Sequence, residues 1–359
     1  MQEMKEEFLI LDSVDNFSEW KSLFLSWEKR EPFVHPSYPS LFCNEKTSAK
    51  CAVLKAPEGI VMYPFLLRDI GKEDFALSLD AKDIITAYGY GGRYVISGHK
   101  NDQLSHLFNQ HFNAWTAAAN VICEVIKFHL FEEDLLTFPG LTESPLANIG
   151  VNLSLSAEEI WTGFEHKVRK NVKKAQRSEL KTISESSGNY LEDFLRIYYN
   201  TMDRRLAKEN YYFTPDFFKK IILLMPENFR FFHVLSDEKI ISTELCLLSR
   251  DNIYSFLGGT NPQYFELRPN DLLKHEIILW GKENKKKWFV LGGGNSENDG
   301  IFKYKKSFAP QSIFRFNIGT LIYNVEKYNL LLDTKSNYFA EKRNETWKPI
   351  KGFIPEYRT

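Results

Sequence analysis

Apolar residues along this chain recur in two patterns: short runs that predict strands, and longer segments with helical spacing that predict amphipathic helices. In the first half, Cys51–Leu54 and Ile60–Leu67 flank a Pro-Glu-Gly turn and predict a β-hairpin. A strand from Ile84 then runs into a glycine-rich loop, followed by a helix over roughly 103–118 and a strand over 121–131. The first half therefore predicts the order hairpin, glycine-ended strand, helix, strand.

The second half shows the same order of predicted elements. Phe229–Leu235 and Ile240–Leu248 predict a hairpin, and Ile253–Leu257 predicts a strand that ends in two glycines. A helix over roughly 270–284 and a strand over Trp288–Leu291 follow. Because residue identity between the halves is weak, this is a repeat of structure rather than of sequence. It predicts an α/β fold with two domains, each a mixed sheet with helices on its faces.

A mainly helical segment connects the two repeats. It begins at a capping-box pattern formed by Ser156 and Glu159, so we place the domain boundary near residue 155. The predicted domains are an N-terminal domain over residues 1–155 and a C-terminal domain over residues 156–309.

Composition limits the classes of function. The 359-residue chain is 43% hydrophobic, which is ample for packed cores, and its net charge of −1 provides no global basic field for nucleic acid. Its four cysteines are scattered without CxxC spacing, which fits a reducing compartment. The polar, acidic start is unlike a signal peptide, and no apolar run approaches the roughly 20 residues of a membrane span. We therefore expect a cytoplasmic protein without a membrane span.

The last third of the chain carries the densest chemical pattern. Two strands there end in the glycine runs Gly258-Gly259 and Gly292–Gly294, and glycines let backbone NH groups come close to a ligand. Arg268 and Asn270 open the helix between these strands, and a helix N-terminus favours a ligand that carries negative charge. The pattern predicts an anion-binding site.

Three side chains near these glycines could carry catalytic chemistry. Glu244 interrupts an apolar strand; it either faces solvent by strand alternation or faces the site as a general base. Tyr254, on the neighbouring strand, could then donate to a developing oxyanion or to the leaving group. Lys305 follows Asp299 and the second glycine run, and its ammonium either is solvated or holds a phosphate or a tetrahedral oxyanion.

Two basic patterns could bind phosphate. Residues 166–177 contain six Lys or Arg residues and no acid, which indicates either a solvated helix face or a seat for phosphates of a nucleotide, coenzyme A or RNA. Arg204 and Arg205 close a helix over about 190–206, and Tyr212 follows. Arginine forks bind phosphate bidentately and tyrosines add stacking surface, whereas the alternative is charge complementation at a helix C-terminus.

Other signatures are missing from the sequence. It contains no GxxxxGK[ST] loop, no HExxH and no GxSxG pattern. Among its histidines only His106 and His111 lie close together, and no cysteine pair accompanies them as a zinc site would require. We therefore expect no metal and set aside the hydrolase and metalloenzyme classes.

Several motifs, read in order along the chain, resemble the Fem-like tandem GNAT (acetyltransferase) superfamily of N-acyltransferases. Lys167–Ala175 is similar to its R-x-N-[IV]-[RK]-[KR]-A helix, and Tyr88–Gly92 is similar to its first-domain loop. Tyr254–Gly259, Arg268–Asn270 and Gly292–Phe308 are similar to its second-domain core. The combination is far more specific than any one motif.

The resemblance implies two GNAT-like domains in tandem, the first completed by residues 310–359, with an acceptor in a cleft and an acyl donor engaged by the second domain. By position it implies functional roles for Lys305 and Tyr254, and a phosphate contact from Arg204 or Arg205. The candidate catalytic residues are thus Glu244, Tyr254 and Lys305. The candidate substrate-binding residues are Tyr88, Tyr90, Arg204, Arg205, Tyr212, Arg268, Asn270 and Asp299.

The predicted function is transfer of an acyl group from acyl-coenzyme A to the amine of a nucleotide-linked amino sugar, for cell-surface polysaccharide. One departure from ordinary GNAT enzymes is that Arg268–Leu273 lacks the glycines of their [RQ]-x-x-G-x-[GA] pyrophosphate motif. The alternative is transfer of an amino acid from aminoacyl-tRNA to a peptidoglycan precursor, which the basic helix favours and the missing coiled-coil arm disfavours. A third alternative is a degenerate tandem domain that binds without catalysis.

Overall fold

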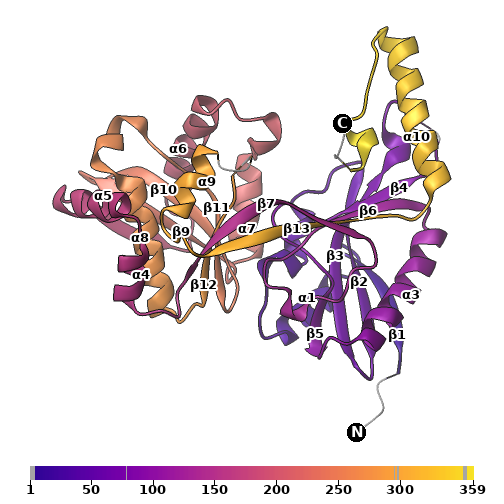
Figure 1. Cartoon of the computed structure of the whole chain (residues 1–359), viewed down its shortest axis with the longest axis horizontal. Helices are drawn as coiled ribbons and strands as arrows, with labels where there is room; N and C mark the ends of the chain where they lie inside the picture. Colours follow the sequence, from indigo (N-terminus) through magenta and orange to yellow (C-terminus); the bar gives the residue numbers. More distant parts are fainter. Residues whose placement is uncertain (1–4, 78, 295, 297–298, 351–353) are drawn as a thin grey trace. The chain divides into compact units, whose positions relative to one another are not determined.

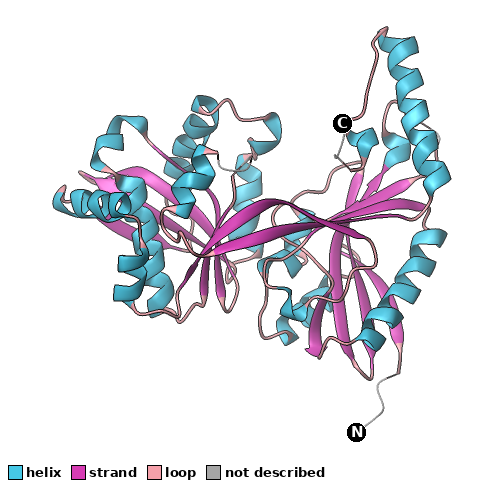
Figure 2. Cartoon of the chain, in the orientation of Figure 1, coloured by secondary structure: helices cyan, strands magenta, loops and turns pink. Residues whose placement is uncertain are grey.

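A computed structural model describes residues 5–77, 79–294, 296, 299–350 and 354–359 (Figure 1). The chain divides into two compact units. The first unit contains residues 1–28, 33–145 and 316–359, and the second contains residues 29–32 and 146–315. Both units combine helices and strands (Figure 2), so the predicted α/β class with mixed sheets is confirmed.

The first unit is built on a mixed sheet. Its elements are β1 (Glu7–Asp12), α1 (Phe17–Ser26), α2 (Ser37–Ser40), β2 (Thr47–Ala56), β3 (Gly59–Asp69), β4 (Lys82–Ile85), β5 (Tyr94–Gly98), α3 (Asp102–Ala118), β6 (Val121–Lys127) and α10 (Val325–Tyr338). The strands lie in the order β1-β2-β3-β4-β6, and β5 also pairs with β3. The β4–β6 pair is parallel, and the other pairs are antiparallel.

The second unit also contains parallel and antiparallel strands. Its elements are α4 (Ala157–Gly163), α5 (His166–Arg177), β8 (Lys181–Glu185), α6 (Leu191–Arg204), α7 (Pro215–Leu224), β9 (Phe229–Ser236), β10 (Lys239–Leu248), β11 (Asn252–Thr260), α8 (Pro269–Glu283), β12 (Trp288–Gly292) and α9 (Gly300–Lys306). The strand order is β12-β11-β10-β9-β8, with β11–β12 parallel. Two further strands, β7 (Leu141–Asn152) and β13 (Ile313–Ile322), begin in one unit and end in the other.

The same order of elements occurs in both units, as the sequence predicts. In the first unit the hairpin β2–β3 is followed by β4, the additional strand β5, α3 and β6. In the second unit the hairpin β9–β10 is followed by β11, α8 and β12. In each case the helix connects two strands that pair in parallel, because a parallel pair needs a crossover connection.

The predicted apolar stripes face the cores. On α3, Leu104, Phe108 and Phe112 are buried against the first sheet. On α5, Val168 and Val172 are buried in the second core, whereas the basic side chains occupy the rest of the helix surface. The segment 166–177 is therefore an amphipathic helix that presents a basic face.

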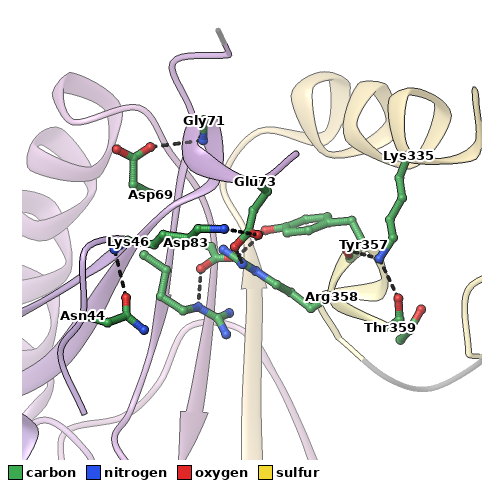
Figure 3. A network of polar contacts seen from close by, with 11 residues as sticks. Asn44, Lys46, Asp69, Gly71, Glu73, Asp83, Lys335, Tyr357, Arg358 and Thr359 are labelled. Atoms are coloured by element: carbon green, nitrogen blue, oxygen red, sulfur yellow. Dashed lines mark hydrogen bonds and ion pairs between the residues drawn. The ribbon is translucent and has the colours of Figure 1, made fainter. Parts of the chain in front are cut away.

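A buried carboxylate ties the last residues of the sequence to β4 within the first unit (Figure 3). Asp83 is fully buried, and its Oδ1 accepts a 2.6 Å bond from Arg68 Nε. Its Oδ2 accepts from the Tyr357 hydroxyl at 2.9 Å and from Arg358 Nε at 3.0 Å. Arg358 also contacts Glu73 at 2.5 Å. One aspartate thus joins strands early in the chain to residues near position 358.

Candidate active site

A buried ion pair lies between β10 and α8 in the second unit. Lys274 Nζ donates to both carboxylate oxygens of Glu244 at 2.6 Å and to Ser255 Oγ at 3.0 Å. Lys274 is only 6% exposed and Glu244 only 3% exposed. Of the two positions that the sequence allowed for Glu244, the structure has the interior one, facing α8.

Lys274 is a member of this cluster that the sequence reasoning missed. It lies on the apolar face of α8, three and four residues before the buried Ile277 and Ile278. A lysine inside the buried stripe of a helix needs a carboxylate partner, because an unpaired buried charge is costly. A lysine in that stripe and a glutamate inside an apolar strand were therefore the available signal.

Lys305 lies on α9, and its side chain reaches the residue that follows β12. Its Nζ donates to the Gly293 carbonyl oxygen at 2.7 Å. Burial lowers the pKa of Lys305 to about 8, and the positive charge of Lys274 acts in the same direction, whereas Glu244 and Asp299 oppose the change. The structure thus brings two of the three predicted catalytic residues, Glu244 and Lys305, into one electrostatic cluster.

Asp299 and Asn270 position the short helix that carries Lys305. Asp299 is the N-cap of α9, and its Oδ1 accepts from the Phe302 backbone NH at 2.7 Å. Asn270 Nδ2 donates to the Tyr304 hydroxyl at 2.7 Å, which joins the first turn of α8 to α9. Both side chains therefore have structural partners in this state. Residues 295 and 297–298 of the predicted motif lie outside the described residues.

Beside this cluster, β11 continues after its pairing with β12 has stopped. The parallel register joins Asn252 to Trp288 and Tyr254 to Val290, and it goes no further in the described part of the chain. β11 nevertheless runs on to Thr260 while it remains paired with β10. The pairing of the two parallel strands thus ends at Tyr254, next to the face on which Ser255 contacts Lys274.

Packing within the second unit explains why glycine stands at these strand ends. A Cβ on Gly259 would lie 2.3 Å from Thr201 Oγ1 of α6, and one on Gly293 would lie 2.5 Å from the Ala147 carbonyl oxygen of β7. Close packing of α6 and β7 therefore requires glycine here whether or not a ligand binds. The sequence interpretation of these glycines as ligand contacts has no support in this geometry.

Tyr254 points away from the cluster. Since neighbouring strand residues face opposite sides and Ser255 faces α8, Tyr254 faces the other side of the sheet. There its hydroxyl donates to Glu31 Oε2 at 2.6 Å, and Asn252 Nδ2 donates to Glu31 Oε1 at 2.9 Å. This buried contact binds the segment Lys29–Pro32 to the rest of the second unit.

We expect the Tyr254→Phe variant to lower the free energy of unfolding by about 1.5–3 kcal/mol, because it removes a hydrogen bond to a buried carboxylate. Denaturant unfolding followed by circular dichroism measures this loss. If the hydroxyl instead stabilised the reacting acyl group, turnover would fall by about 10²–10³-fold, as it does when an oxyanion donor is removed.

The predicted phosphate contacts gather near the end of α6. The Arg204 guanidinium lies 5.1 Å from the centre of the Phe265 ring, and Arg205 caps the C-terminus of α6. The Tyr212 hydroxyl donates to Asp203 Oδ1 at 2.9 Å. Burial lowers the pKa of Arg204, and the charge of Arg205 adds to this effect.

Arg268 occupies a junction in the same unit. It has a φ of 60°, in the left-handed region, between the 3₁₀ helix η5 (Pro262–Leu267) and α8. Its guanidinium lies 4.0 Å from Glu266.

Asn171 of α5 donates to Asp271 at 3.1 Å, which fixes the basic helix to the start of α8. Asn171, a residue of the Fem-like motif, thus makes a contact between two helices of the second unit.

Tyr88 and Tyr90 belong to the first unit. The Tyr38 hydroxyl donates to the Tyr88 carbonyl oxygen at 2.5 Å. The Tyr90 ring packs edge-on against Phe33 and Phe316, and burial raises the pKa of its hydroxyl. The Tyr90 ring therefore lies in an aromatic cluster of its own unit, and Tyr88 is joined to Tyr38 through its backbone.

The described ranges contain no group of three or more His, Cys, Asp or Glu residues arranged to hold a metal ion. Within the same ranges, no helix combines the length and the apolar character needed to cross a membrane.

Residues 163–306, which include the whole Glu244–Lys274–Lys305 cluster, match a family model described as the acetyltransferase (GNAT) domain. The chain therefore contains a GNAT acetyltransferase domain, and it is a transferase enzyme of the acyltransferase class. No curated protein sequence matches the chain.

Solved structures extend the similarity over nearly the whole chain. A structure of FemX superposes with a TM-score of 0.67 at 11% identity, covering 90% of this chain and 99% of that one. L-PGS from Bacillus licheniformis gives 0.52 at 12% identity, covering 89% and 95%. The C-terminal domain of a protein described as a lysylphosphatidylglycerol synthetase from Agrobacterium fabrum gives 0.53 at 11% identity, covering 91% and 97%. The predicted Fem-like GNAT fold is confirmed.

Proposed function

We propose that this enzyme moves an acyl group from an acyl-coenzyme A thioester to the amine of a nucleotide-linked amino sugar, for cell-surface polysaccharide. The observation that carries the proposal is the cluster of Glu244, Lys274 and Lys305 inside the GNAT segment, beside the place where the pairing of β11 with β12 ends. An extended donor arm with amide groups can bind an unpaired strand edge as an added strand does. Its acyl carbon would then lie near Lys305.

The acceptor in this proposal carries phosphate. Arg204 and Arg205, at the end of α6, provide two guanidinium groups, and Tyr212 adds an aromatic surface close to them in sequence. Guanidinium groups bind phosphate oxygens in pairs, with more specificity than a single ammonium. The other proposed substrate-binding residues are Tyr88, Tyr90, Arg268, Asn270 and Asp299.

A second candidate function is the use of aminoacyl-tRNA as donor. Asp271, in the first turn of α8, is 7% exposed, and burial raises the pKa of its carboxyl group. An acid at this helix N-terminus, in a run without glycines, disfavours close contact with the pyrophosphate of coenzyme A. The basic face of α5 would in turn suit the phosphates of RNA.

Two measurements separate these donors. In thermal unfolding of the full chain, a ligand at about 100 times its dissociation constant should stabilise the protein by roughly 2.7 kcal/mol. We expect stabilisation by both acyl-coenzyme A thioesters and nucleotide-linked amino sugars. Amide formation in crude extract should also survive treatment with ribonuclease. Loss of activity after this treatment, together with a response to nucleotide sugars alone, would assign the donor as aminoacyl-tRNA.

A further inference from the structure

Glu244 is poorly placed to accept a proton. Both of its carboxylate oxygens accept bonds from the same ammonium group, Lys274 Nζ, at 2.6 Å. Protonation of Glu244 would leave the charge of Lys274 buried at 6% exposure without its counter-ion. Breaking a buried pair in this way is strongly unfavourable. The acid–base group of the reaction is therefore to be found beside this pair rather than in it.

Lys305 has the geometry that Glu244 lacks. One N–H of its Nζ is taken by the Gly293 carbonyl oxygen at 2.7 Å. A neutral lysine amine has two N–H bonds and one lone pair, so this contact leaves the lone pair available. The amine also lies on a short helix fixed by the Asp299 cap and by the bond from Asn270 to Tyr304, which holds it in one place.

We propose that neutral Lys305 takes the proton of the attacking amine, and that Lys274 is a positioning residue that holds Glu244 charged and favours the neutral form of Lys305. This inference rests on the proposed acyl transfer and names the route of its proton. It applies to a thioester donor and to an aminoacyl ester donor alike, because both transfers release one proton from the amine.

The step balances as follows. The amine lone pair forms the new C–N bond, and the carbonyl π pair moves to oxygen to give a tetrahedral adduct. Lys305 removes one proton from the new ammonium nitrogen. The adduct then collapses, the bond to the leaving sulfur or oxygen breaks with its electron pair, and Lys305 returns the proton to that atom. No other reactant is needed, and Lys305 ends neutral.

The charges around Lys305 come from three elements. Lys274 on α8 disfavours its protonated form, and Glu244 on β10 and Asp299 before α9 favour it. β7 contributes Asn148, which carries no charge. Burial is the largest influence, and it lowers the pKa of Lys305 to about 8. A substantial fraction of Lys305 is therefore neutral near this pH.

The test is the pH dependence of amide formation in the full chain. We expect the Lys274→Met variant to move the rising limb of the kcat/KM profile to higher pH by about one unit or more. Without the positive charge of Lys274, the negative charge of Glu244 raises the pKa of Lys305 unopposed. In the double variant Lys274→Met/Glu244→Gln both charges are absent, and the limb should return toward pH 8. The ¹³C shift of Lys305 Cε, assigned by its loss in Lys305→Met, should titrate in parallel.

Other outcomes overturn the inference. If Glu244 were the base, the double variant would lose turnover at every pH. If Lys274 acted only in packing, its replacement would lower the rate without moving the limb or the ¹³C titration. Absence of amide formation with thioesters and with aminoacyl esters would instead reject the proposed function, and the proton route with it, even where the titration of Lys305 follows Lys274.

Discussion

The Asp83→Ala variant is expected to lose about 3–5 kcal/mol of unfolding free energy, the largest effect on stability that the structure indicates. The carboxylate is fully buried and receives bonds from Arg68, Tyr357 and Arg358. Removing it takes away the counter-ion that Arg68 and Arg358 share. Urea unfolding of the full chain followed by circular dichroism measures the loss.

Glu19→Ala provides the matched control in the same unit. Its carboxylate lies 3.3 Å from Lys55 and is 43% exposed, so we expect a change of about 0–1 kcal/mol. Equal losses in the two variants would show that the Asp83 cluster adds no more than a surface ion pair. Arg358→Met should reproduce part of the Asp83 effect, because Arg68 and Tyr357 still contact the carboxylate.

The Lys305→Met variant is expected to reduce turnover by about 10²–10⁴-fold, the usual contribution of a general acid–base group. Methionine keeps an unbranched side chain, one heavy atom shorter, and removes both the amine lone pair and the charge. Steady-state assays with the donor identified by the stabilisation experiment measure this loss. A reduction smaller than about tenfold would exclude Lys305 from the chemical step.

We expect the same Lys305→Met variant to raise the free energy of unfolding at neutral pH, although it lowers turnover. The pKa of Lys305 is about 8 in the folded chain, against an ordinary value of 10.5. Below pH 8 both states bind the proton, and the folded state carries the full cost of the partly buried charge. Between pH 8 and 10.5 the unfolded chain binds more protons, so the free energy of unfolding rises with pH. The stability advantage of Lys305→Met over wild type should therefore shrink between pH 8 and 10.5. Measuring the free energy of unfolding of both proteins at a series of pH values tests this.

Periodicity predicted the fold well because the repeat is strongly patterned. The hairpins, the crossover helices and the buried stripes of α3 and α5 follow from alternation and from 3.6-residue spacing, which act over short distances. The order of motifs identified the GNAT segment. Glu244 was selected as a candidate because it interrupts an apolar strand, and Lys305 because it follows the second glycine run and matches a functional lysine of the Fem-like motif.

The partners of these residues could not be predicted in the same way. Lys274 lies 30 positions from Glu244, and Glu31 lies 223 positions from Tyr254. Such pairings depend on which strands become neighbours and on which face each side chain lies, so a one-residue change of strand register would exchange the roles of Tyr254 and Ser255. The role of the glycines is ambiguous in the sequence for a related reason, because close packing and ligand contact require the same missing Cβ.

The contact between Asp83 and Arg358 also bears on how the chain matures during synthesis. The two residues are 275 positions apart, so the ribosome needs roughly 15–55 s to make the second after the first, at about 5–20 residues per second. Throughout this interval the nascent first unit lacks Tyr357 and Arg358, and the second unit is made in full before these two residues are added. We therefore expect the second unit to be the first to complete its folding, and the part of the protein that is translated earliest to depend longest on chaperones.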